Sequence, residues 1–180
     1  MDRHPLSRLA IRGLFAGLLA GTAAALALAG TAGAQPFAGF DSNQPVNYAA
    51  DRIELQDRQN RVVLSGDVVI TQGDLRLTAA RTTVAYTDTD TLRIQRIDAS
   101  GGVTVTRGGE RASAAAGVYD FNRRVIVLSG GVALRRNGDT LNGGRLTIDL
   151  DSGLASVDGR GAGTATPGRV TGTFTVPGGN

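Results

Sequence analysis

A short strand-corner-strand unit occurs three times in the chain and limits how it can fold. Each copy has a Ser-Gly pair followed by alternating apolar residues, and the pairs begin at Ser65, Ser100 and Ser129. The first and third copies share a longer frame at a fixed offset, because Val62–Gly66 matches Ile126–Gly130. Repetition of one short unit indicates a fold that is built by stacking copies of it.

The pattern between these corners is typical of β-strands. Apolar residues alternate with polar ones in short runs, as on strands that bury one face. Turn signals separate the runs, including Gly108-Gly109 and the favoured hairpin pair Asn137-Gly138. No longer window after the first 34 residues has helical apolar spacing, and the Ala-rich stretch 112–116 is short. The sequence therefore predicts an all-β protein, which leaves a sandwich, a barrel and a solenoid open.

The N-terminus has the layout of a secretory signal peptide. Arg3, Arg8 and Arg12 precede an apolar run from Leu14 to Ala29, and Ala32-Gly33-Ala34 supplies an A-x-A site. We expect residues 1–34 to be cleaved off. An uncleaved membrane anchor is the alternative, although the run is short and rich in Ala and Gly for a membrane span.

Cleavage would leave residues 35–180 as a single domain of 146 residues, enough to bury a core. Within it, residues 159–168 are predicted to form a Gly-rich loop and residues 177–180 a loose tail. Alternation from Val170 to Val176 predicts a last strand before Pro177.

The composition of the domain excludes several kinds of chemistry. It has 16 basic and 15 acidic residues once three Arg and one Asp leave with the signal, which is too balanced for a nucleic-acid surface. It lacks Lys and Cys, and the only His is His4. The absence of these residues excludes thiol nucleophiles, Ser-His pairs, Schiff bases and Walker phosphate loops. The carboxylates at Asp88 and Asp90, and at Asp149 and Asp151, are interpreted as solvated turns. We expect that the domain binds no cofactor or metal and has no enzymatic activity. A glycosidase with a pair of carboxylates is the remaining catalytic alternative.

Three segments carry a resemblance to a known family. Gly66–Gly73 resembles the G-N-V-x-V-x-Q-G signature of the OstA-like domain. Gln44–Asp51 is similar to the first strand, and Val170–Pro177 to the last strand, of the LptA family of periplasmic lipopolysaccharide-transport proteins. The resemblance implies an open, twisted, V-shaped β-jellyroll of two sheets and about sixteen short antiparallel strands.

The resemblance also implies a function. Proteins of this family bridge an LptC-like inner-membrane protein to an LptD-like outer-membrane protein by stacking head to tail, and lipopolysaccharide acyl chains lie inside the fold. We therefore expect a periplasmic lipopolysaccharide-binding bridge. An LptC-like anchored partner that keeps residues 14–29 is the main alternative, and a structural β-repeat of the envelope is another.

Alternation and the resemblance together give candidate site residues. Ser42 is placed near the entrance of the groove. The predicted lipid contacts are Val46, Tyr48, Leu64, Val68, Ile70, Val103, Val105, Tyr119, Leu128 and Val132. Unpaired first and last strands would template pairing with another chain. The predicted assembly edges are Pro45, Val46, Tyr48, Val170, Phe174 and Val176.

Overall fold

The computed structural model describes residues 40–160 and 168–175, which belong to the compact unit 32–180. The predicted signal peptide, most of the Gly-rich loop, Val176 and the predicted tail lie outside the described residues. No bilayer-spanning helix occurs in the described ranges, where the only helical element is the 3-10 turn η1 (Asp57–Gln59).

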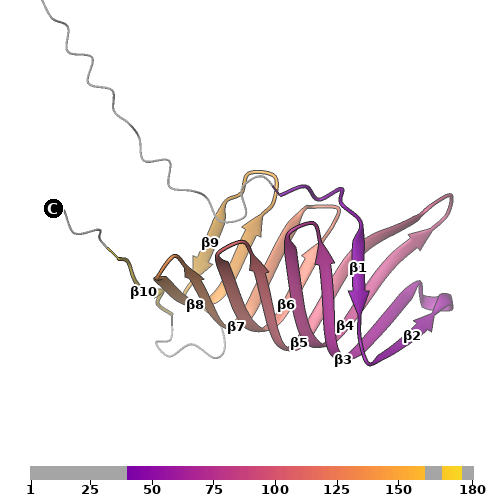
Figure 1. Ribbon diagram of the computed structural model, residues 1–180, viewed down its shortest axis with the longest axis horizontal. Coiled ribbons are helices and arrows are strands. Elements are labelled where there is room, and N and C mark those ends of the chain that lie inside the picture. The colour runs from indigo at the N-terminus through magenta and orange to yellow at the C-terminus, as the bar shows by residue number, and fades with distance from the viewer. Residues whose placement is uncertain (1–39, 161–167, 176–180) are drawn as a thin grey trace, which may run out of the picture. The chain divides into compact units, whose positions relative to one another are not determined.

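Ten strands form one antiparallel sheet (Figure 1). They are β1 (Val46–Ala49), β2 (Arg52–Gln56), β3 (Arg61–Gln72), β4 (Leu75–Asp88), β5 (Leu92–Arg107), β6 (Glu110–Asp120), β7 (Val125–Arg136), β8 (Asp139–Asp149), β9 (Ala155–Asp158) and β10 (Thr171–Thr173). The order is β1-β3-β4-β5-β6-β7-β8-β10, and β2 and β9 pair with β3 and β8 as well. The predicted all-β class is confirmed.

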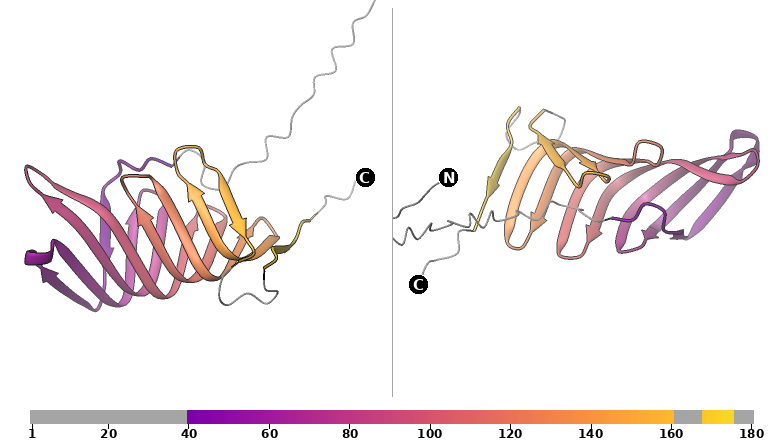
Figure 2. Two further views of the ribbon diagram at one scale, coloured as in Figure 1. Left: turned by 180° about the vertical axis from the view of Figure 1, so that it is seen from behind. Right: turned by 90° about the horizontal axis from the view of Figure 1, so that it is seen from above.

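The six long strands, β3 to β8, are each bent near the middle, where the pairing register shifts. β1 and β2 pair with the two halves of β3, and β10 and β9 pair with the two halves of β8. Each of these short pairs therefore acts as one further bent strand. The prediction of about sixteen short strands corresponds to the halves of these eight bent strands, whereas the continuous strands number ten. Figure 2 shows the strands side by side along the folded sheet.

The bend divides the sheet into two layers that continue into each other along one fold line. Layer A comprises residues 46–49, 68–72, 75–79, 103–107, 110–114, 132–136, 139–143 and 171–173. Layer B comprises residues 52–56, 61–65, 81–88, 92–100, 116–120, 125–129, 145–149 and 155–158. The predicted V-shaped jellyroll is thus a single hydrogen-bonded sheet folded over on itself.

The core lies between the two layers. Alternate side chains of both layers point inward and form one buried cluster. Its fully buried members include Leu64, Val68, Ile97, Val103, Val105, Ile126, Leu128, Val132, Leu146 and Ile148. Such a core contains few aromatic rings, as the composition indicates.

Glycine makes the bend possible. Gly101 and Gly130 have φ of 81° and 86°, a left-handed conformation that side chains with a Cβ rarely adopt. A Cβ on either glycine would lie 2.7 Å from the Cβ of an alanine on the neighbouring strand, Ala80 or Ala115. From β4 to β7 small residues therefore alternate along the fold line, Ala on β4 and β6 and Gly on β5 and β7. The Ala-rich stretch 112–116 belongs to β6 and supplies one of these alanines.

The last strand is shorter than predicted. Alternation from Val170 to Val176 predicts a strand over that range, but β10 covers Thr171–Thr173 only. The backbone N–H of Thr175 donates to the Asp139 carboxylate at 2.8 Å rather than to a strand partner. This side-chain contact takes the place of the next ladder bond, so regular pairing stops after Thr173.

The fold line yields a prediction about stability. Gly101→Ala should destabilise the domain by at least about 1 kcal/mol more than Gly102→Ala, because both positions have φ near 80° but only Gly101 faces a neighbouring Cβ. Urea unfolding at neutral pH measures both variants against wild type. Equal losses would mean that the close Gly-Ala approach contributes nothing beyond backbone strain.

Candidate functional site

The interior between the layers is the best-developed apolar site in the described residues. Eight of the ten predicted lipid contacts lie in its buried cluster: Leu64, Val68, Ile70, Val103, Val105, Tyr119, Leu128 and Val132. They come from both layers, so the bend brings together residues that are far apart in sequence. The fold line closes one side of this interior.

The two predicted contacts on the first strand differ from the other eight. Val46 packs against the cluster and is half-buried, whereas Tyr48 is 57% exposed. β1 pairs with β3 on one side and is an edge of the sheet on the other. Side chains that point inward from this edge strand therefore lie at the open end of the interior. There is room at that end for the large ring of Tyr48.

Side chains fill the interior near its β1 end. A cavity of about 10 Å³ remains there between Val46, Gln72 and Leu75 of layer A and Tyr119 and Ile126 of layer B. This volume is at the lower limit for one water molecule. An acyl chain could enter only if these side chains rearranged or the layers moved apart.

The opposite end of the interior is more open. A cavity of about 180 Å³ lies between layer A residues, including Leu134 and Leu141, and layer B residues Ala155 and Val157. Phe174, which is 70% exposed, also borders it. Its walls are mainly apolar, with Arg136 paired to Glu110 at 3.2 Å. This end therefore has a preformed, mainly apolar cavity.

Gln72 is the buried polar group that connects the parts of the site. It is 3% exposed at the end of β3, and its side-chain amide donates to the carbonyl oxygens of Ser42 and Gln44 at 2.8 and 2.9 Å. Its Oε1 accepts a hydrogen bond from the Tyr119 hydroxyl at 3.1 Å. One side chain therefore joins layer A, layer B and the segment before β1, with all its main hydrogen-bonding groups satisfied.

Residues 40–44, which we call the N-terminal strap, lie along the open side of the folded sheet before the chain enters β1 (Figure 1). Phe40 packs against the core, and the Arg107 guanidinium lies 5.5 Å from its ring centre. Arg107 also pairs with Asp74 at 2.9 Å. Ser42, predicted to lie near the entrance of the groove, contacts Gln72 through its carbonyl oxygen, and its place at an entrance stays a prediction.

Hydrogen bonds within the strap fix its shape. The Asp41 carboxylate accepts from the Asn43 backbone N–H at 3.0 Å and from the Gln44 side chain at 3.1 Å. These donors lower the pKa of Asp41, the backbone bond having the larger effect. The sequence analysis did not single out Gln72 as a site residue, although the glutamine of the Gly66–Gly73 motif marked it.

Two aromatic rings from β6 and its following turn stand in layer B. Tyr119 and Phe121 stack with ring centres 3.9 Å apart and planes 20° apart, on one face as their spacing predicts. Burial raises the pKa of Tyr119 to about 12, because the phenolate would have to leave water. The hydroxyl therefore remains a donor to Gln72 throughout the neutral range.

The carboxylates considered as catalytic or metal groups are located elsewhere. Asp149 accepts backbone N–H bonds from Asp151 and Ser152, and the Ser152 bond has the larger effect in lowering its pKa. Asp151 pairs with Arg124 at 2.9 Å. In residues 40–160 and 168–175, no three His, Cys, Asp or Glu side chains gather as a metal site would require.

The chain is similar to known proteins over most of this fold. It matches the family described as LptA/(LptD N-terminal domain) LPS transport protein over residues 48–154. An uncharacterized protein of Rhizobium meliloti (strain 1021) is 30% identical over 160 residues, which cover 85% of this chain and 84% of that protein. The lipopolysaccharide export system protein LptH of Pseudomonas aeruginosa is 40% identical over 74 residues, covering 41% of this chain and 35% of that protein.

A solved structure shares the fold. The crystal structure of LptH from Pseudomonas aeruginosa, described as the LptA homologous periplasmic component of the conserved lipopolysaccharide transport device, aligns with a TM-score of 0.65. The alignment covers 76% of this chain and 99% of that one at 23% sequence identity. It shows that the two chains have the same folded sheet.

The burial of Tyr119 gives a pH-dependent prediction. Because burial raises the pKa of Tyr119 to about 12 in the folded protein, against about 10 in an unfolded chain, the free energy of unfolding should fall as pH rises from 10 to 12, where the unfolded chain loses the proton first. Tyr119→Phe should remove this loss while costing about 1–2 kcal/mol at pH 7, where Gln72 loses a donor. Urea unfolding of both proteins at several pH values measures the difference, and parallel profiles above pH 10 would contradict it.

Proposed function

Because the chain belongs to the LptA/LptD N-terminal domain family of lipopolysaccharide transport proteins, we propose that it carries lipopolysaccharide between the two membranes, with the acyl chains held between layers A and B. The observation that carries this proposal is the apolar interior, which runs from the β1 edge to the β10 edge of a sheet that never closes. Transfer of a lipid along such a path breaks no covalent bond, so the proposal includes no catalytic step.

The driving force for binding is burial of the acyl chains. Each methylene group removed from water contributes about 0.8 kcal/mol, so even part of one chain gives several kcal/mol. The proposed contacts are the ten predicted residues, of which Val46 and Tyr48 lie at the β1 end and Leu128 and Val132 deeper in the cluster. The open cavity beside Phe174 supports a second opening at the other end.

Lipid entry at the β1 end requires a change in the strap. The 10 Å³ cavity there is too small for an acyl chain, and Gln72 holds the strap and Tyr119 beside it. We propose that an acyl chain displaces the strap and separates Gln72 from Tyr119. The strap carbonyls can then bond with water, so their release costs little.

The two ends of the sheet support head-to-tail assembly. At the first end Tyr48, Ile53 and Leu55 are 57%, 42% and 68% exposed. At the last end Leu154, Val170 and Phe174 are 58%, 39% and 70% exposed. Large exposed apolar side chains beside unpaired strand edges favour β-augmentation by another chain.

Pairing of the first end of one copy with the last end of the next is heterologous and would build an open filament. We propose that LptC-like and LptD-like proteins use the same edges. Pro45, Val46, Tyr48, Val170 and Phe174 are the predicted edge residues that the structure describes, and Ile53, Leu55 and Leu154 extend the set.

The proposed location is the periplasm, after cleavage of residues 1–34. The basic opening, the apolar run and the Ala32-Gly33-Ala34 site support export. N-terminal sequencing of the protein from cells should begin at Gln35. A membrane-bound form that begins at Met1 would favour the LptC-like anchored partner instead.

Photo-crosslinking tests the lipid path. A photoreactive amino acid in place of Val46 should capture lipopolysaccharide, whereas the same residue in place of Asn47 should not, because the two side chains point to opposite sides of β1. Gel mobility and antibody detection of lipopolysaccharide measure the adduct. A second pair, Tyr119 and Asp120, repeats the comparison in layer B.

Capture at neither inward position, with purified lipopolysaccharide present in excess, would show that these are ordinary core residues. Equal capture at inward and outward positions would show surface binding. Either result would overturn the proposed path.

Truncation tests the assembly edge. Ending the chain at residue 168 removes β10 and Phe174 and should abolish the concentration-dependent growth in size that light scattering detects for the full chain. The matched control is Phe174→Ser, which keeps the β10 backbone and should weaken growth only in part. If the truncated chain grows as the full chain does, the β10 edge is not the joint.

A further inference from the structure

The outer surfaces of the two layers carry different charge patterns. Two rows of outward positions, aligned by strand pairing, cross layer A. They are Asn47, Thr71, Arg76, Thr106, Arg111, Arg135, Thr140 and Thr173, and Ala49, Val69, Thr78, Thr104, Ser113, Ala133, Asn142 and Thr171. These sixteen positions contain three arginines and no Asp or Glu.

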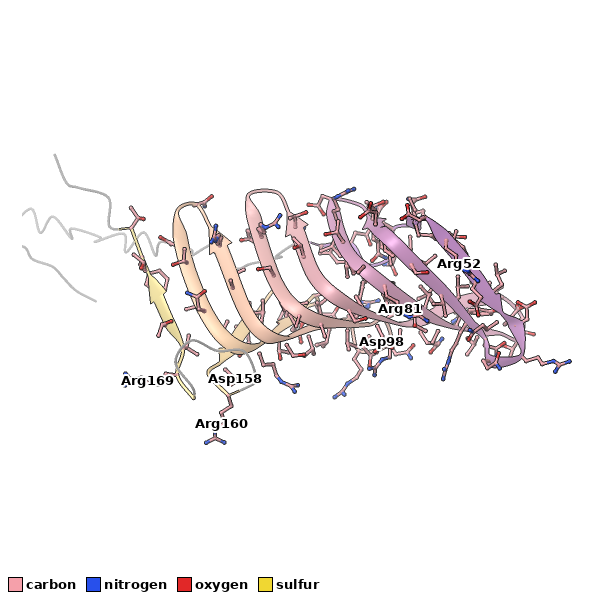
Figure 3. All side chains as sticks on the ribbon, turned by 90° about the horizontal axis from the view of Figure 1, so that it is seen from below. Arg52, Arg81, Asp98, Asp158, Arg160 and Arg169 are labelled. Carbon is pink, nitrogen blue, oxygen red and sulfur yellow. The ribbon has the colours of Figure 1, made fainter. Side chains whose placement is uncertain are left out.

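The corresponding surface of layer B is balanced. Its three outward rows contain the arginines Arg52, Arg61, Arg81, Arg96 and Arg145 and the acids Glu54, Asp98, Asp120, Asp149 and Asp158. Arg96 binds Asp98 through both its Nε and a terminal nitrogen at 2.9 and 2.6 Å. Figure 3 shows Arg52, Arg81, Asp98 and Asp158 spread over the molecule among neighbouring side chains.

The arginines of layer A lie on one row. Arg76 is aligned with Thr106, Thr106 with Arg111, and Arg111 directly with Arg135 on the next strand. Two like charges opposite each other on paired strands repel, which destabilises the sheet. The Arg111 guanidinium is oriented by the Thr104 hydroxyl, to which it donates at 3.3 Å.

The nearest carboxylates lie at the borders of this surface. At the turns, Asp74 pairs with Arg107, Glu110 pairs with Arg136, and Asp139 accepts the Thr175 backbone N–H. At the fold line, Asp51 and Asp67 share a hollow with Arg76. The Arg111–Arg135 pair lies between these borders.

We propose that the outer surface of layer A docks on the phosphate headgroups of an anionic lipid bilayer. Guanidinium groups and hydroxyls donate hydrogen bonds to phosphate oxygens, and a second layer of negative charge would relieve the Arg111–Arg135 repulsion. The surface is one broad face of the sheet. This inference concerns the outside of the fold and does not depend on lipid transport through the interior.

The side chains favour a membrane over an acidic protein as the partner. Protein interfaces centre on large apolar or aromatic anchors. The sixteen positions of layer A include only Ala49, Val69 and Ala133 as apolar residues, and Val69 is half-buried. Attraction would come almost wholly from charge, which gives weak, reversible and salt-sensitive binding.

Vesicle flotation tests the proposal with the exported chain. Vesicles of phosphatidylcholine alone and of equal parts phosphatidylcholine and phosphatidylglycerol are mixed with wild type, with R76Q/R111Q/R135Q, and with R52Q/R81Q/R145Q. The second triple removes the same net charge from layer B and is the matched control. Wild type should float with the anionic vesicles only, at low salt, and the control triple should keep most of this binding.

The layer A triple should lose about 100-fold in vesicle affinity, since each basic residue near an anionic surface contributes about fivefold. Circular dichroism and thermal unfolding of each variant verify the fold. Equal losses of vesicle affinity in the two triple variants would show that net charge alone attracts the protein. If wild type does not float with anionic vesicles, it does not dock on such membranes. Either result overturns the proposal. Crosslinking of lipopolysaccharide at Val46 should be unchanged in the layer A triple, which separates this test from that of the transport path.

Discussion

The bend in each long strand is the constraint on which the rest of the structure depends. An antiparallel sheet that stays flat buries one face at most, whereas a sheet folded along one line encloses its inner face without closing into a barrel. Left-handed glycines at 66, 101 and 130 allow the bend, and Ala80 and Ala115 allow neighbouring strands to bend at the same level. Because the sheet of the described strands remains open, it keeps an edge at β1 and another at β10 as well as an enclosed apolar interior.

The open side between the two layers needs a cover, which the strap supplies by packing Phe40 against the core and by a set of hydrogen bonds to Gln72. Gln72 bonds to two strap carbonyls and to the Tyr119 hydroxyl, so the cover and both layers share one buried side chain. Each of these bonds can be exchanged for a bond to water or to a ligand at a small net free-energy difference. Leu64 and Val68 beside the fold line, by contrast, are fully buried in apolar contacts. The domain therefore has a closed side held by apolar burial and an open side held largely by exchangeable hydrogen bonds.

The two outer surfaces show that identical backbone geometry can carry different chemistry. Strand pairing places Arg111 opposite Arg135 in layer A. In layer B, Arg96 forms a hydrogen-bonded ion pair with Asp98 on the same strand. Neither arrangement affects the core, because both sets of side chains point away from it. Charge on these surfaces is free to serve contacts with partners or membranes, whereas the interior positions are tied to packing.

The sequence by itself determined the all-β class, the turns at Gly108-Gly109 and Asn137-Gly138, the Ser-Gly corners and the inward direction of residues such as Val68, Leu128 and Val132. These follow from periodicity and glycine content, which act within a few residues. Tertiary structure alone decided that Gln72 meets Ser42 and Tyr119, that Ala80 lies against Gly101, that Arg111 lies opposite Arg135 and that β10 ends at Thr173. Each of these depends on the register between segments roughly 20 to 50 residues apart, and alternation within one strand cannot fix how it is aligned with the next.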